Sequence, residues 1–75
     1  MSAWIKIEER KPPQGVFVLV CIYDPRPKVM MNFICIAERH GESFYDGSNG
    51  ELVQQKGSIV THWMPLPDFP VDNND

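Results

Sequence analysis

The chain has 75 residues, of which 43% are hydrophobic and 23% charged, and its net charge is −3. This composition is typical of a globular protein and not of a disordered one. A chain of this length forms one small domain, which leaves little room for a cofactor in a deep cleft. The acidic balance and the scattered lysines and arginines disfavour nucleic-acid binding, because that function needs clustered positive charge.

The N-terminus and the two cysteines indicate a cytoplasmic protein. The opening MSAWIKIEER has no long apolar segment of the kind a signal peptide carries. No apolar stretch reaches the roughly 18 residues that a membrane span needs, so no membrane association is expected. Cys21 and Cys35 are therefore expected to remain reduced thiols.

The first half of the chain predicts three strands in succession. Residues 2–7 (SAWIKI) form a short strand, followed by a charged turn and by Pro12-Pro13-Gln14-Gly15, where Gly15 can adopt a positive φ. Residues 16–23 (VFVLVCIY) give the strongest strand signal, because they are mostly β-branched or aromatic. After a proline-rich turn at 24–28, residues 29–37 (VMMNFICIA) form its antiparallel partner.

The second half of the chain predicts short strands separated by turns. Residues 43–46 (SFYD) predict a short strand, and the glycine-rich residues 47–50 predict a turn. Residues 51–54 (ELVQ) fit either a strand end or a helical turn. Residues 59–64 (IVTHWM) form the last strand, which Pro65 and Pro67 end because neither has an N–H to donate.

The central hairpin has an unusual pattern, since both of its faces are apolar. A turn centred near Arg26 would pair Cys21 with Met31 and Cys35 with Phe17. One face then holds Phe17, Leu19, Cys21, Tyr23, Met31, Phe33, Cys35 and Ala37, and the other holds Val16, Val18, Val20, Ile22, Met30, Ile34 and Ile36. In an antiparallel sheet with one solvent-exposed face, hydrophobic and polar residues should alternate along each strand. We therefore expect the second face to be covered within the chain, with a second subunit, and hence a homodimer, as the alternative.

The fold class that follows is mainly β. It is a small curled antiparallel sheet, or a partly open barrel, built on the central hairpin with little or no helix. Residues 1–70 form the single domain, and the acidic tail at 71–75 frays. Trp4, Trp63 and Met64 are the structural anchors, and together with Ile5 they are the candidates to cover the hairpin's second face.

No constellation of residues predicts catalysis or metal binding. Cys21, Cys35, His40 and His62 match a zinc set in number, but their spacing does not, and the same separation argues against a disulfide. The serines lack a recognisable catalytic setting. The protein is therefore predicted to be no enzyme and to need no cofactor.

Three residues are candidates for contact with a partner. His62 lies opposite Trp63 along the last strand, so it points away from the core if Trp63 points into it; a histidine bonded to the backbone is the structural alternative. Phe44 and Tyr45 are aromatic side chains at a short strand near turns. In the tail, Pro67 and Pro70 have a Pro-x-x-Pro spacing, although a segment that covers a sheet edge explains it as well.

Several of these features resemble a known family. Trp4-Ile5, Glu9-Arg10 with Pro12, the valine-rich residues 16–20 and the closing Thr61-His62-Trp63-Met64-Pro65-Leu66-Pro67 resemble small phage and prophage proteins classed as domain of unknown function 551. The resemblance spans the chain, but residues 24–56 are much less distinctive, and residues 24–28 and the cysteines are not part of the family pattern. It implies a bacterial or phage cytoplasmic setting and an accessory role, and it transfers no catalytic residue.

The function expected from all of this is non-enzymatic. The chain is predicted to act as a phage or prophage accessory protein that binds a protein partner, with host and defence factors among the candidates. The alternative is a small-ligand or nucleic-acid-binding module in which aromatic side chains stack on bases. That alternative requires the positive side chains to converge on one side; they are Lys6, Arg10, Lys11, Arg26, Lys28, Arg39 and Lys56.

Overall fold

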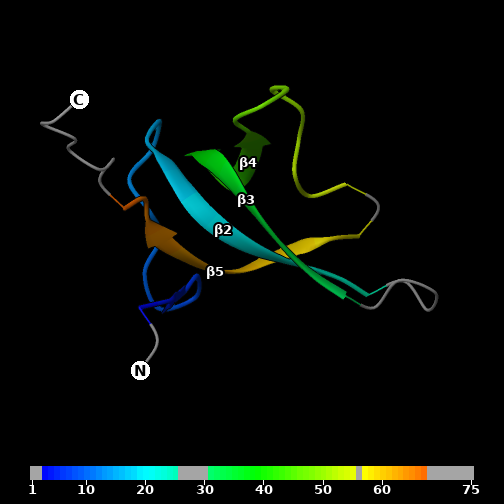
Figure 1. Cartoon of the computed structure of the whole chain (residues 1–75), viewed down its shortest axis with the longest axis horizontal. Coiled ribbons are helices and arrows are strands. Elements are labelled where there is room, and N and C mark those ends of the chain that lie inside the picture. Colours follow the sequence, from blue (N-terminus) through cyan, green and yellow to red (C-terminus); the bar gives the residue numbers. More distant parts are fainter. Residues whose placement is uncertain (1–2, 26–30, 56, 68–75) are drawn as a thin grey trace, which may run out of the picture.

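A computed structural model of the chain describes residues 3–25, 31–55 and 57–67. They form five strands: β1 (Ile5–Lys6), β2 (Phe17–Asp24), β3 (Met31–His40), β4 (Ser43–Asp46) and β5 (Ile59–Pro65) (Figure 1). The predicted acidic tail, the Pro67–Pro70 spacing and most of the turn at 24–28 lie outside the described residues.

The strands form one antiparallel sheet in the order β1-β5-β2-β3-β4. The described residues contain no helix, so the mainly β class is confirmed, and so is the central β2–β3 hairpin. The sheet is open and uncurled, with β1 and β4 as its two edges, so the curling or partial closure into a barrel that the sequence predicted does not occur in the described residues. All five predicted strands occur. Residues 51–54 make only an isolated bridge from Leu52 to Tyr45.

Local sequence signals explain where the strands begin and end. Gly15 has a φ of 74°, which lets the chain turn immediately before β2. Gly41 has a φ of 66° in the two-residue connection between β3 and β4, where hairpins favour residues with positive φ. Strand β5 ends at Pro65, as the missing N–H predicts.

The predicted register of the central hairpin is wrong. Cys21 pairs with Ile34 and Cys35 pairs with Val20, so the partner of each lies three residues further along than predicted. An odd shift moves every side chain of one strand to the other face. As a result Cys35 and Ala37 join Val18 and Val20, while Ile34 and Ile36 join Leu19 and Cys21.

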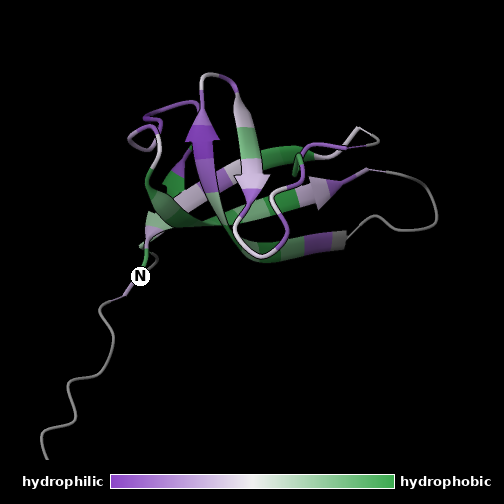
Figure 2. Cartoon of the chain, turned by 90° about the horizontal axis from the view of Figure 1, so that it is seen from above, coloured by the Kyte–Doolittle hydropathy of each residue, from purple (hydrophilic) through white to green (hydrophobic). Residues whose placement is uncertain are grey.

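One face of the sheet, which we call the inner face, carries the core. Its buried residues are Val18, Val20, Ile22, Ala37, Phe44, Val60 and Trp63. Ile7, from the segment before β2, and Val53, from the segment after β4, pack against this cluster and cover it. Figure 2 shows hydrophobic colour along the long strands, with the hydrophilic colour mainly in the connections and at the C-terminal end of β3.

Specific hydrogen bonds fasten the segment before β2 onto this face. The Trp63 indole N–H donates to the Arg10 carbonyl at 2.7 Å, and the Arg10 guanidinium lies 5.7 Å from the Trp63 ring centroid. Arg39 Nε donates to the carbonyl of the buried Pro12 at 2.7 Å. Gly15 N–H in turn donates to the Arg39 carbonyl at 2.9 Å. These bonds hold the segment across the sheet and shield Trp63 from water.

The predicted covering role of Trp63 and Met64 is wrong. Both residues belong to β5, so they extend the sheet sideways and do not lie over it. Trp63 pairs with Val20 on the inner face, and Met64 pairs with Leu19 on the opposite one. Ile5 pairs with Trp63 at the edge and packs against the core. The second face of the hairpin is therefore not covered by Ile5, Trp63 or Met64. Trp4, the fourth candidate, lines a cavity on that face together with Cys21 and His62.

Candidate functional site

The opposite face, which we call the outer face, is the candidate site. Side chains alternate along a strand, so the residues between the buried valines of β2 point to this face. Their cross-strand partners follow from the register: Leu19 lies between Ile36 and Met64, and Cys21 lies between Ile34 and His62. The outer face thus comprises Phe17, Leu19, Cys21, Tyr23, Ile34, Ile36, His62 and Met64.

The middle of the outer face is apolar and exposed to solvent. Ile34 is 62% exposed, Ile36 45% and Phe17 44%, whereas Val20 directly behind them is fully buried. Clustered exposed side chains of this size are characteristic of interaction surfaces. The both-sided apolarity of the sequence therefore has a structural counterpart, one covered face and one bare face.

A turn narrows one end of the outer face into a groove. Gly47 N–H donates to the Ile36 carbonyl at 2.8 Å, so the turn after β4 comes up against the sheet. A Cβ on Gly47 would lie 3.2 Å from Phe17 Cε1 and 3.3 Å from Ile36 Cγ2, which explains why glycine suits this position. The resulting cavity measures about 570 Å³. Its lining consists of Phe17, Leu19, Ile34, Cys35, Ile36, Asp46, Gly47, Ser48 and Leu66.

A second, more polar cavity lies on the same face towards β1. It measures about 440 Å³ and is lined by Trp4, Lys6, Glu9, Cys21 and His62. Lys6, His62 and Cys21 form one row across β1, β5 and β2, because each is the direct cross-strand partner of the next. This row brings a thiol beside an imidazole, an adjacency that the sequence did not predict.

The His62 ring lies against the Thr61 hydroxyl. Thr61 Oγ1 is 3.3 Å from the Cys21 carbonyl, to which the hydroxyl donates, and 3.0 Å from His62 Nδ1. Whether Nδ1 donates or accepts in this contact depends on the ring tautomer. In the tautomer with the proton on Nδ1, Nε2 carries the lone pair that can bind a metal.

The far end of the outer face is polar and aromatic. Tyr45 pairs with Glu38, which in turn pairs with Phe17, so both lie on this face. The His40 and Tyr45 rings meet edge to face at 5.6 Å, and His40 Nε2 lies 3.1 Å from Glu38 Oε1. Polar groups thus border the apolar centre on two sides.

The structure separates the three residues predicted to contact a partner. His62 and Tyr45 lie on the outer face, at opposite sides of its apolar centre. Phe44 alternates to the inner face, where it is 3% exposed and part of the core. The candidate site is accordingly defined without Phe44, and its centre is formed by Ile34 and Ile36, which were not singled out as site residues from the sequence.

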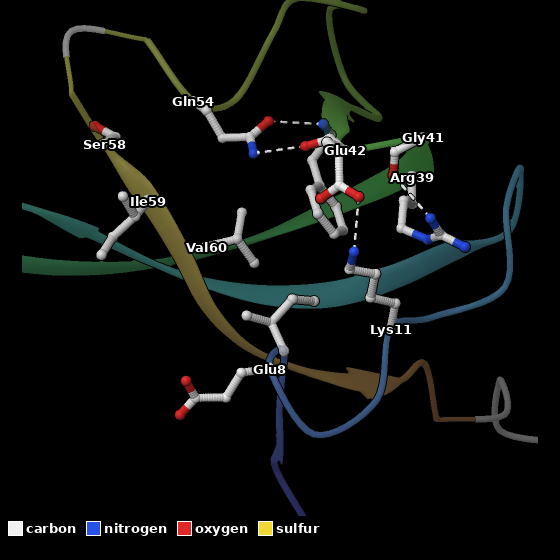
Figure 3. A pocket seen from close by; sticks show the side chains of 11 residues that line it. Glu8, Lys11, Arg39, Gly41, Glu42, Gln54, Ser58, Ile59 and Val60 are labelled. Atoms are coloured by element: carbon white, nitrogen blue, oxygen red, sulfur yellow. Dashed lines mark hydrogen bonds and ion pairs between the residues drawn. The ribbon is translucent and has the colours of Figure 1, made fainter.

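A charged cleft lies on the inner side of the sheet (Figure 3). It measures about 290 Å³. Lys11 Nζ lies 2.7 Å from Glu42 Oε2, and this hydrogen bond lowers the pKa of Glu42. Arg39 Nη1 donates to the Gly41 carbonyl, and Gln54 bonds to Phe44 N–H and to the Glu42 carbonyl. Figure 3 shows these side chains directed at one another, with Glu8 pointing away. They tie the β3–β4 turn to its neighbours.

The positive side chains do not gather at one site in the part of the chain that the structure describes. Lys6 lies in the row on the outer face, whereas Lys11 and Arg39 line the charged cleft. Arg10 lies over the Trp63 ring. Arg26, Lys28 and Lys56 lie outside the described residues. This distribution gives no support to the nucleic-acid alternative.

The two cysteines lie on opposite faces of the sheet and are both free thiols. Burial, and to a lesser extent the charge of Asp46, raises the pKa of Cys35 above its ordinary value. Within residues 3–25, 31–55 and 57–67, no three His, Cys, Asp or Glu side chains come together as a metal site. Among the described residues, Cys21 and His62 are a neighbouring thiol and imidazole, which is a pair of ligands and not a complete site.

These features define a class: a small antiparallel β protein with one closed core and one bare apolar face. The chain belongs to the family described as Protein of unknown function (DUF551), whose family model matches residues 3–71. Comparison with curated proteins and with solved structures gave no significant match. None of the described residues forms a helix long and apolar enough to cross a membrane.

Proposed function

We propose that this chain is a non-catalytic accessory protein of phage or prophage origin that acts in the cytoplasm by binding a protein partner with its outer face. The observation that carries the proposal is the exposure of Ile34 and Ile36 in the middle of the sheet, beside Phe17. The phage or prophage setting rests on the closing motif at residues 61–67 and on the resemblance it carries.

The energetics favour a partner with a broad surface. Burying a large apolar side chain contributes about 1.5–3 kcal/mol, so several side chains on one open face can hold another protein. The groove beside Gly47 is shallow and continuous with the exposed isoleucines, which suits a protruding apolar side chain of such a partner. Polar groups at both sides, among them Lys6 and Glu38, match the rim that surrounds the apolar centre of protein interfaces.

The test compares two matched substitutions. Ile34→Asp places a charge in the centre of the outer face, and Leu52→Asp places one at another exposed apolar position, beside the inner-side residues Ile22 and Cys35. Both side chains are exposed, so both variants should fold, which circular dichroism checks. The tagged chains are used for affinity capture from the native host and for sedimentation velocity.

Wild type and Leu52→Asp should retain the same partner, or the same self-association, and Ile34→Asp should lose it. A chain that stays strictly monomeric and captures no partner would overturn the proposal. Equal binding by wild type and Ile34→Asp would also overturn it, because the partner would then be held elsewhere.

A further inference from the structure

We propose that Cys21 and His62 bind a thiophilic divalent cation such as Zn²⁺, and that a second copy of the chain, docked on the outer face, supplies the other two ligands. The inference rests on the proposed function, since it names a second copy as a partner of the same face. The site would be of the Cys₂His₂ type, with one cysteine and one histidine from each copy.

The two ligands of one chain are already side by side. Cys21 and His62 are direct cross-strand partners on one face, and the Cβ atoms of such a pair are about 4.5–5.5 Å apart. Both line the same cavity. Thiolate sulfur and imidazole nitrogen are the ligands that Zn²⁺ prefers, so the types and the spacing of the two groups suit this ion.

The hydrogen bonding of His62 also suits metal coordination. A metal-binding histidine usually donates its other ring N–H to a fixed acceptor, which holds the tautomer and the ring orientation. His62 Nδ1 lies 3.0 Å from the Thr61 hydroxyl, and Thr61 itself donates to the Cys21 carbonyl, so the ring orientation is fixed. In the tautomer with the proton on Nδ1, Nε2 carries the lone pair that coordination requires.

The described part of one chain does not complete the site. Structural zinc takes four ligands in a tetrahedron, and the described residues provide no group of three or more. The pair lies on β2 and β5, which are two of the three strands between the edge strands β1 and β4. On the outer face it is next to the exposed Ile34. A copy docked on that apolar surface by a twofold axis presents the same pair in return, because such an interface joins identical patches.

The dimensions and the charges are compatible with this arrangement. Packed sheets lie about 10 Å apart, so an ion midway is about 5 Å from each, a distance that the cysteine side chain and a Zn–S bond of about 2.3 Å can span. Each Cys21 thiol loses one proton on coordination, and the two resulting thiolates balance the charge of Zn²⁺.

Cys35 supplies the matched control. It is the neighbour of Val20 on the inner face, away from His62, and its raised pKa makes it a poorer source of thiolate. Replacing Cys35 therefore removes a thiol without touching the proposed site.

The experiment uses the full chain, freed of metal and kept under a non-thiol reductant. Co²⁺ is titrated as a spectroscopic substitute for Zn²⁺, and sedimentation velocity is run with and without Zn²⁺. Wild type and Cys35→Ser should develop the visible absorption of tetrahedral thiolate-bound Co²⁺ with an end point of one ion per two chains, and Zn²⁺ should convert monomer to dimer. Cys21→Ser and His62→Gln should each weaken metal binding at least about tenfold and abolish the metal-dependent dimer.

Each contrary result separates the two proposals. A dimer that forms without metal, survives Cys21→Ser and is lost in Ile34→Asp overturns the metal site and supports the binding face. One ion per chain without dimerisation overturns the shared site. No thiolate-bound Co²⁺ and a monomer at every Zn²⁺ concentration overturn the inference, and partner capture then decides the proposed function alone. If Cys21→Ser does not fold, His62→Gln on its own decides the ligand assignment.

Discussion

Trp63 shows how much of this small fold depends on single side chains. It is 4% exposed, it occupies the inner face of β5, and its indole N–H holds the segment before β2 through the Arg10 carbonyl. Replacing it therefore removes core volume and a tertiary hydrogen bond together. His62, the adjacent residue, lies on the other face and is only half-buried, so the same strand carries a structural residue and a surface residue side by side.

Trp63→Ala should lower the free energy of unfolding by about 3–5 kcal/mol, the usual cost of emptying a core site of this size. Since domains this small are marginally stable, the variant should be largely unfolded, as urea titration followed by tryptophan fluorescence or circular dichroism would show. His62→Ala is the control and should change stability by no more than about 0.5 kcal/mol. Unfolding of His62→Ala as well would make the histidine structural and remove it from the site.

Asp46 permits a pH-dependent test at a single carboxylate. The Ser48 hydroxyl and the Ser48 backbone N–H, the latter at 2.7 Å, donate to its Oδ1, and the hydroxyl bond is the larger cause of the lowered pKa. A lowered pKa stabilises the fold above the ordinary carboxyl range, and that contribution disappears as the pH falls through the lowered value. Ser48→Ala should move the pKa of Asp46 back towards its ordinary value. NMR titration of the Asp46 carboxyl measures this, and an unchanged pKa would contradict the assignment.

At the scale of elements, the central hairpin shows what the sequence could and could not predict. The β-branched run in β2 and the prolines after β5 identified the strands, and short connections identified their antiparallel order. The register was wrong because it depends on which residues pair first. The proline-rich stretch that starts at Asp24 indicates a turn but does not specify that Asp24 pairs with Met31. Because the register was shifted by an odd number of residues, Ile34 and Ile36 were assigned to the other face and were not predicted as site residues.

The pairing of Cys21 with His62 was hidden for a related reason. The two residues are far apart in the chain, and their contact arises because β5 is inserted between β1 and β2. A β-bulge near Cys21 and Ile22 adjusts this pairing further. No local pattern encodes either feature, so only the sheet order reveals a thiol beside an imidazole. The Trp63–His62 alternation, which needs only the period of a strand, was predictable.

The β3–β4 hairpin permits a test of turn chemistry. Gly41 has a φ of 66°, and a Cβ placed on it would meet nothing within 4 Å. Gly41→Ala should therefore cost about 1–2 kcal/mol from backbone strain alone, measured by urea denaturation. Gly41→Asn is the matched control and should cost less, because asparagine tolerates the left-handed region. Equal losses from both variants would show that something other than backbone conformation makes glycine necessary.

At the scale of the whole molecule, the two faces of the sheet differ in how far other segments cover them. Ile7 and Val53 pack against the core of the inner face. On the outer face the turn at Gly47 comes up against Ile36, yet Ile34 and Ile36 remain exposed. We propose that another protein molecule covers this second face, and that this molecule is a second copy of the chain joined through a metal ion.

Methyl NMR tests this central claim most directly. The full chain, labelled at isoleucine, leucine and valine methyls, is titrated with Zn²⁺ and with any captured partner. We expect the methyl signals of Leu19, Ile34 and Ile36 to shift or broaden on binding. The methyl signals of Val18, Val20 and Val60 on the inner face should stay unchanged. Changes confined to the inner face or to the charged cleft, or none on the outer face when binding is established by sedimentation, would contradict it.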